Sequence, residues 1–260
     1  MTAIIRNESR RLLRGSLVLG GAYALLLLFI LSVFPSMAEQ AELIEEAFPD
    51  VMRGLFGFEE LHTLEGFIGS YVFSLMWVVF MGLYVAYLTG GMIAGDIRER
   101  RMDLILANPV SRESVVLQKF ASLWVPISVL IVIQVVMLYG GSIMFDETLN
   151  PVALVLLHLL SVPYLLVCGG IGIILSVTLS REETAQAGAL AIVFLLWLLE
   201  GLSEFNPDYE WIGEIAPSRH FDPAEILIHE EYAWIDAGFL LLAAVVLIGI
   251  ALFLFVRRDI

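Results

Sequence analysis

The sequence predicts an all-α integral membrane protein with six transmembrane helices. Hydrophobic residues make up 59% of the 260 residues and charged residues only 16%, whereas soluble domains are about 45–50% apolar and about 25% charged. Six stretches are almost free of charged residues and are about as long as the roughly 20 residues that cross a bilayer. When all six stretches are counted as spans, the segments that connect them alternate in charge without conflict. The predicted spans are approximately residues 16–37, 67–94, 120–145, 151–179, 184–202 and 236–256.

The chain begins with a basic amphipathic stretch, residues 4–13, which predicts an N-terminal helix at the membrane interface ahead of the first span. The arginines of this stretch, the apolar run that follows it and Ser36-Met37-Ala38 also resemble a secretory signal peptide with its cleavage site. The apolar core is longer than the about 7–15 residues of such a peptide. We therefore interpret it as the first transmembrane helix.

Local signals mark where further helices begin. Asn150-Pro151 combines an N-cap residue with proline at the first helical position, so the fourth span should begin there. Asp222-Pro223 repeats this pattern with an acid two residues later, which predicts a short helix over about residues 223–231.

The fifth span is the shortest, since its charge-free run covers only residues 184–199. It crosses the membrane if Glu200 lies at the headgroup level and Leu202 extends the apolar face. We expect Glu200 to be an interfacial acid on the external side. The alternative is a role in proton-coupled transport, for which an acid within the membrane is the usual requirement.

Basic residues predict the orientation. Twelve of the fourteen Lys and Arg residues fall on one side of the predicted topology, and only Arg53 and Arg219 fall on the other. Twenty of the 28 acids lie on the side of Arg53 and Arg219. By the positive-inside rule, both termini should be cytoplasmic in a multi-pass protein of the plasma membrane. The basic segments are residues 1–14, 96–119, 181 and 257–258.

Motifs for catalysis are missing from the sequence. It has no P-loop, no zinc-protease motif and no nucleophile elbow, and Cys168 is the single cysteine. The net charge of −14 argues against a nucleic-acid partner. A lone His158 in the fourth span is expected to pack rather than to bind a ligand. We predict no catalytic residue, no metal site and no cofactor, so the chain should not be an enzyme.

The most informative segment is the first cytoplasmic connection, residues 96–119. Met102, Ile105 and Leu106 share one helical face, and Asn108-Pro109 ends the helical stretch. Ser111 is a plausible N-cap for the next helix. The second span should continue directly into this segment and make a stiff elbow. From mechanical considerations alone, an ordinary interfacial loop is an equally good interpretation of this segment.

This segment resembles the signature of the ABC type-2 permeases, the membrane subunits of many ATP-binding-cassette (ABC) exporters. The family pattern is an acid, a Gly-Thr-acid step, a Leu-Leu run, Pro-Val-Ser-Arg and a Lys about seven residues on. Arg100 and Arg101 stand in place of the Gly-Thr step, so the local turn is not fixed by the pattern. Residues 255–260 and 4–13 resemble the family's closing and opening stretches. The matching positions are Asp96, Asp103, Leu104, Leu106, Pro109, Val110, Ser111, Arg112 and Lys119.

The resemblance implies a permease that moves a substrate by alternating access, driven by a separate ATPase subunit. Two permeases, identical or homologous, would pair in the lipid membrane, with helices two and five lining the path. Each would dock its ATPase through the elbow: Met102, Leu104, Ile105 and Leu106 would enter a groove, and Asp103 and Arg112 would fix the orientation. The residues assigned to this coupling elbow are Asp96, Glu99, Met102, Asp103, Leu104, Ile105, Leu106, Pro109 and Arg112.

The resemblance also implies that the connection between the fifth and sixth spans dips partly back into the membrane from outside. In this chain that connection, residues 201–233, carries Trp211, Ile212 and Ile215 beside acids, which suits an interfacial segment. A solvent-exposed loop is the alternative.

Two other functions stay open: a carrier or channel that works without a motor, and a non-transporting membrane anchor of an ATPase complex. The substrate cannot be identified from the sequence.

Small residues recur at every fourth position on the second span. This spacing places them on one helical face, where they let another backbone approach closely. We therefore predict a tight helix–helix contact along this face. The residues are Gly82, Ala86, Gly90 and Ala94.

Overall fold

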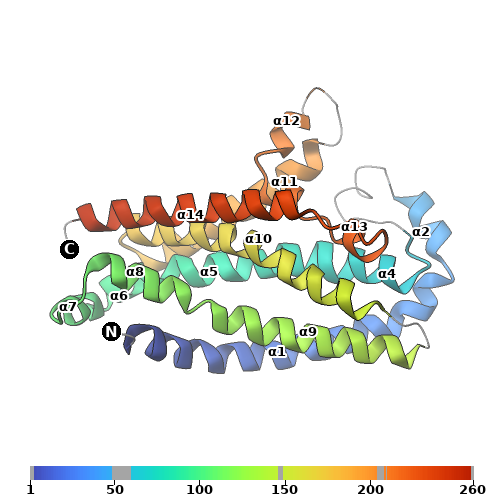
Figure 1. The fold of residues 1–260 in the computed structure, drawn as a ribbon, viewed down its shortest axis with the longest axis horizontal. Coiled ribbons are helices and arrows are strands. Elements are labelled where there is room, and N and C mark those ends of the chain that lie inside the picture. The colour runs from blue at the N-terminus through green and yellow to red at the C-terminus, as the bar shows by residue number, and fades with distance from the viewer. Residues whose placement is uncertain (1–2, 49–59, 146–148, 204–207, 209, 259–260) are drawn as a thin grey trace.

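The computed structural model describes residues 3–48, 60–145, 149–203, 208 and 210–258, and the elements in this part of the chain are helices. Six helical stretches are long and apolar enough to cross a membrane, which confirms the six predicted spans. They lie along one common direction (Figure 1). These stretches are Ala3–Ala38, Leu64–Arg98, Arg112–Met144, Pro151–Thr178, Glu182–Ser203 and Trp234–Arg257.

The first span is a single helix, α1 (Ala3–Ala38). The basic residues 4–13, predicted as a separate interfacial helix, form the first turns of α1 instead. No proline interrupts the chain there, so the helix continues into the apolar run. Its buried residues recur every three or four positions, which makes one stripe facing the protein. They are Glu8, Leu12, Ser16, Gly20, Leu27, Leu31 and Phe34.

The second span is built from four consecutive helical pieces. Thr63 caps the first piece, since its hydroxyl accepts a hydrogen bond from the Gly66 amide at 3.0 Å. The next piece is a π-helix, a rare form that is frequent at functional sites. The pieces are α4 (Leu64–Phe67), the π-helix η1 (Ile68–Met81), α5 (Gly82–Met92) and α6 (Ala94–Arg98).

Contrary to our prediction, the second span does not continue into the coupling elbow as one unbroken helix. Helix α6 ends at Arg98, and Arg100 adopts a left-handed conformation with φ of 56° before α7 (Arg101–Leu106) begins. Left-handed backbone is incompatible with a continuing right-handed helix. The elbow is therefore a separate short helix that the chain reaches through a sharp turn.

The third span consists of α8 (Arg112–Ala121) and α9 (Trp124–Met144). Ser111 caps α8 as predicted, because its hydroxyl accepts from the Ser114 amide at 3.2 Å. The helices are separated at residues 122–123, just before Pro126, which lacks the amide that would bond back to residue 122.

The remaining spans are α10 (Pro151–Thr178), α11 (Glu182–Ser203) and α14 (Trp234–Arg257). Helix α10 is the most buried span, while α1, α11 and α14 are the least buried. The predicted cap of α10 is confirmed, since the Asn150 side chain accepts from the Val152 amide at 2.9 Å. Helix α10 therefore forms the centre of the bundle.

Ser176 of α10 holds the break between α5 and α6. Its hydroxyl accepts hydrogen bonds from the amides of Ile93 and Ala94 at 2.9 and 3.0 Å. A buried amide without an acceptor is costly, so this serine stabilises the bend at the end of the second span.

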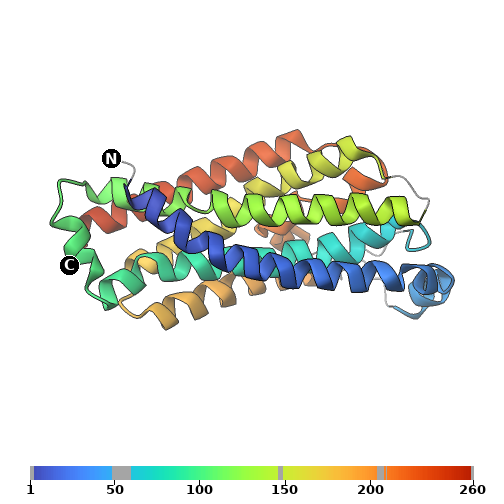
Figure 2. The same ribbon diagram turned by 90° about the horizontal axis from the view of Figure 1, so that it is seen from below.

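Both termini of the described chain lie at one end of the bundle together with α6, α7 and α8 (Figure 1). The opposite end carries α2 (Ala41–Ala47), α4 and α13 (Pro223–Leu227). Seen from below, α1 and α9 lie side by side along the same direction (Figure 2). The two termini lie at the same end because the number of spans is even.

Candidate functional site

Helix α7 presents two different surfaces. Met102 is fully buried, and Ile105 and Leu106 are partly buried against the core. Leu104 points outward and is 71% exposed, next to the exposed Asp103. The four apolar residues of the predicted elbow therefore do not form one docking surface. The reason is helical geometry: the chain rotates by about 100° per residue, which puts residues 102 and 104 on opposite sides.

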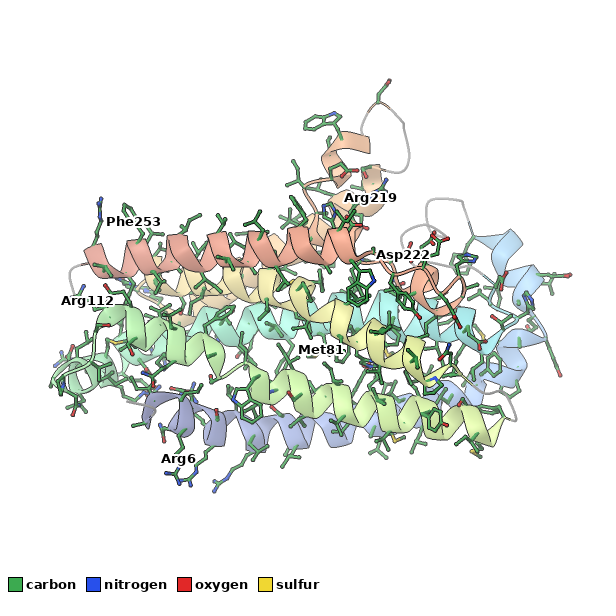
Figure 3. The ribbon with its side chains drawn as sticks, in the orientation of Figure 1. Arg6, Met81, Arg112, Arg219, Asp222 and Phe253 are labelled. Atoms are coloured by element: carbon green, nitrogen blue, oxygen red, sulfur yellow. The ribbon has the colours of Figure 1, made fainter. Side chains whose placement is uncertain are left out.

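The elbow residues outside α7 also differ in how exposed they are. Glu99 is exposed and pairs with Arg101 at 2.5 Å. Pro109 is exposed as well, whereas Asp96 is buried. Arg112 turns back to the bundle, where its guanidinium donates to the carbonyls of Phe255 and Arg258. Arg112 thus fastens the elbow to the end of α14, as its position in Figure 3 illustrates.

A buried cluster of charges lies directly behind α7. Lys119 has a fully buried side chain and binds two carboxylates, Glu8 at 2.6 Å and Asp96 at 2.7 Å. The other oxygen of Asp96 accepts from Arg101 Nε at 2.9 Å. We call these four residues the ion cluster. It joins α1, α6, α7 and α8 at one point.

Sequence reasoning identified part of the ion cluster. Asp96 and Lys119 are two of the positions that match the permease signature, and the structure shows that they form one ion pair. Glu8 was missed, although two signals mark it. It is the only acid among residues 1–38, and it falls in the same four-residue spacing as Leu12 and Ser16.

The electrostatics of the ion cluster make it rigid. A buried charge is expensive unless it is paired and hydrogen-bonded. Lys119 offers three donors and no acceptor, and both carboxylates are nearly fully buried, at 7% and 3% exposed. Separating the helices would leave unpaired charges in the interior, so α1 and the elbow should move as one unit.

The same end of the bundle holds a second set of ties. Arg258 donates to the carbonyls of Val177 and Leu179 at 2.6 and 3.3 Å, which links the end of α14 to the connection between α10 and α11. Arg98 pairs with Glu183, linking the end of the second span to the start of α11. Displacement at this end can therefore reach several spans.

The small-residue face of the second span packs tightly within the chain. A Cβ on Gly82 would lie 2.5 Å from the Tyr164 hydroxyl of α10, and one on Gly90 would lie 3.1 Å from the Gln186 Cα of α11. Ala86 and Ala94 on the same face are fully buried. At Gly82 and Gly90, α5 therefore lies very close to α10 and α11.

Part of the described segment between the fifth and sixth spans packs against the bundle, whereas α12 (Glu210–Gly213) stands off it (Figure 1). Phe221 stacks on Tyr164 near the middle of α10, with ring centroids 6.4 Å apart. Asp222 caps α13 as predicted, accepting from the Ala224 amide at 2.8 Å, although α13 is shorter than the predicted helix. This packing is compatible with a partly re-entrant segment. The depth in a membrane stays a prediction.

His158 and Glu200 occupy structural positions. The His158 ring lies 5.0 Å from Phe73 and 5.5 Å from Trp77, and its Nδ1 is 2.7 Å from the Leu154 carbonyl oxygen. Glu200 accepts a hydrogen bond from Ser218, which ties α11 to the 3-10 helix η3 (Pro217–His220). Within the described ranges, no group of three or more His, Cys, Asp or Glu side chains is arranged to hold a metal.

Comparison with known proteins identifies the family of this six-span protein. A search of curated proteins gives no match to this chain. The model of one family, described as ABC-2 family transporter protein, matches residues 2–260. The match covers nearly all of the 260 residues, including the coupling elbow and the six spans. The chain therefore belongs to the ABC-2 transporter family of membrane proteins.

Proposed function

We propose that the chain is a permease subunit that a separate ATPase drives through the outward face of α7. The proposal rests mainly on Leu104, which is 71% exposed beside Asp103 within the six-residue helix α7. An apolar side chain in that position gains about 1.5–3 kcal/mol when a partner covers it fully. Met102 on the opposite face anchors the helix in the bundle.

The contact differs from the one that the sequence suggested. Leu104 would enter the groove of the ATPase, and Asp103 would orient it. Met102 would hold α7 from behind. Arg112 would tie the elbow to α14 rather than contact the partner, because its guanidinium is engaged with backbone carbonyls.

The ion cluster suggests how a push on α7 would reach the spans. Arg101, in the first turn of α7, bonds to Asp96, and Asp96 shares Lys119 with Glu8 of α1. Alternating access would follow if displacement of α7 tilts α1 and α8 together. Two copies, or one copy with a homologue, would enclose the path, with the termini in the cytoplasm.

The test is co-purification of a P-loop ATPase with tagged wild type and two variants in the native host. Leu104→Asp should lower ATPase recovery at least roughly tenfold, since a full leucine contact exceeds the free energy of one tenfold step. The control is Leu43→Asp on α2. Leu43 is 69% exposed and lies at the opposite end of the molecule. This variant should retain the ATPase.

Three results would contradict the proposal. If Leu104→Asp retains the ATPase as wild type does, α7 is not the docking element. Substrate flux through the purified chain without any ATPase would identify a carrier or channel. An ATPase that binds through Leu104 but supports no substrate movement would identify an anchor.

A further inference from the structure

A groove opens between the start of α1 and the start of α9, on the bundle surface beside the ion cluster. Its cavity volume is about 430 Å³, within the range of about 300–1,000 Å³ that is usual for ligand pockets. The polar residues along it are Arg6, Ser9 and Arg10 of α1 and Ser128 of α9, and the apolar walls include Leu13 and Trp124. None of the described residues that line this groove is Asp or Glu.

The charge of the groove is opposite to that of the chain. The protein has a net charge of −14, yet two arginines, and among the described residues no Asp or Glu, border this otherwise apolar groove. Arg6 and Arg10 are four residues apart, so they share one helical face. Both are exposed, and Arg6 projects away from the neighbouring helices (Figure 3). Guanidinium groups donate hydrogen bonds and accept none, and they fit phosphate oxygens in particular.

The groove also has a direction. Helices α1 and α9 run the same way, because Gly20 contacts Ile133 and, further along both helices, Leu31 contacts Gly141. Arg6 and Arg10 come well before the charge-free run of α1, which begins at Gly15, and Leu13 lies between them and this run. The polar end is therefore at the headgroup level and the apolar end points into the bilayer. A phospholipid in that leaflet has the same polarity.

Two of the apolar residues that line the groove are exposed on the outer surface of the bundle. Leu13 is 41% exposed and Trp124 is 59% exposed. Tryptophan is enriched at the headgroup level of membrane proteins. From the charge, the direction and the exposure together, we propose that this groove binds one anionic phospholipid. Its phosphate lies on Arg6 and Arg10, and an acyl chain lies along Leu13 and Trp124. The proposal does not depend on how the permease is driven.

Trp124 provides the test. The protein is placed in vesicles of acyl-brominated phosphatidylglycerol or acyl-brominated phosphatidylcholine, because bromine quenches nearby tryptophan. The Trp124 signal is the difference between wild type and Trp124→Phe. Titration of the brominated lipid into unbrominated phosphatidylcholine should show a roughly tenfold preference for the anionic lipid. Both lipids carry a phosphate, but the choline cation of phosphatidylcholine offsets its charge, so two cationic side chains favour the headgroup with a net negative charge.

The preference should disappear in Arg6→Gln/Arg10→Gln. The control is Arg181→Gln/Arg257→Gln, which changes the net charge equally at the same end of the bundle but leaves the groove intact. This control should keep the preference. Equal quenching of the wild type by both lipids overturns the proposal without any charge variant. So does a preference that survives in Arg6→Gln/Arg10→Gln, or shielding of Trp124 from both lipids by the co-purified ATPase.

Discussion

At the residue scale, Lys119 is the side chain on which the candidate site depends most. It is the single lysine of the chain and its side chain is fully buried. Its ammonium group pairs with both Glu8 and Asp96, which come from different helices, and Arg11 and Arg101 supply further positive charge to these carboxylates. A buried ion pair is often no more stable than an apolar pair of similar volume, but removing one partner leaves an uncompensated charge. The arrangement therefore fixes position more than it adds stability.

Lys119→Met should lower the free energy of unfolding by about 3–5 kcal/mol, because Glu8 and Asp96 lose the buried cation that they share and keep only the half-exposed Arg11 and Arg101. The measurement is thermal unfolding in detergent. Adding Glu8→Gln and Asp96→Asn to this variant should restore part of the loss, since the uncompensated charges are then gone. A single variant that unfolds at the wild-type temperature would show that Lys119 does not hold these helices together.

Arg100 illustrates a limit of sequence reasoning at this scale. The family pattern places a Gly-Thr step where this chain has Arg100 and Arg101, and Arg100 takes the left-handed conformation that glycine adopts without strain. Arginine has no preference for that conformation, so nothing in its chemistry announces a turn. The pattern located the elbow, but the break after Arg98 became visible only in the structure.

At the scale of elements, the helices were predictable where local chemistry determines them. The caps at Ser111, Asn150 and Asp222 are present, because each side chain has an unpaired amide within reach. The π-helical form of η1 and the break between α5 and α6 were not predicted. They depend on tertiary partners such as Ser176, which lies 83 residues further along the chain than Ile93.

The close approach of α5 to α11 gives a direct test of packing. Gly90→Ala should destabilise the protein by about 1–3 kcal/mol, because the new methyl group would lie 3.1–3.3 Å from backbone atoms of α11. Gly140→Ala on α9 is the matched control, since nothing lies within 4 Å of its added Cβ. The control should be neutral or more stable by about 0.5–1 kcal/mol, as alanine favours a helix.

Thermal unfolding of both alanine variants in detergent makes this comparison. Equal unfolding temperatures for Gly90→Ala and Gly140→Ala would mean that α5 and α11 do not approach as closely as the structure shows.

At the scale of the whole molecule, the number of spans could be predicted because the thickness of the bilayer sets the length of a spanning helix. The alternation of charge between the connections could be predicted because arginines concentrate in the segments on one side of the membrane. Which residues meet between spans was not predictable, as the case of Glu8 shows. The direction in which each side chain of α7 points could be predicted only in part. Helical geometry alone separates Leu104 from Met102, but which of them is buried depends on the surrounding bundle.

The orientation of the whole protein can be tested in a Cys168→Ala background. Glu99→Cys and Asp208→Cys each place a thiol at an exposed position. A membrane-impermeant thiol reagent should label Asp208→Cys in intact cells and Glu99→Cys only after permeabilisation, because basic segments stay in the cytoplasm. Arg181→Cys should behave like Glu99→Cys. Labelling of Glu99→Cys in intact cells would reverse the assigned orientation.

The burial of Lys119 has a chemical consequence. Amine-directed reagents, including many cross-linkers, biotinylation esters and fluorescent dyes, find no accessible side-chain target on this protein while the ion cluster is closed, since its single lysine is completely covered. Acylation at this position would then report that α1 and α8 have separated. The chain thus contains its own covalent reporter of opening at this end of the bundle, and no engineered label is needed to use it.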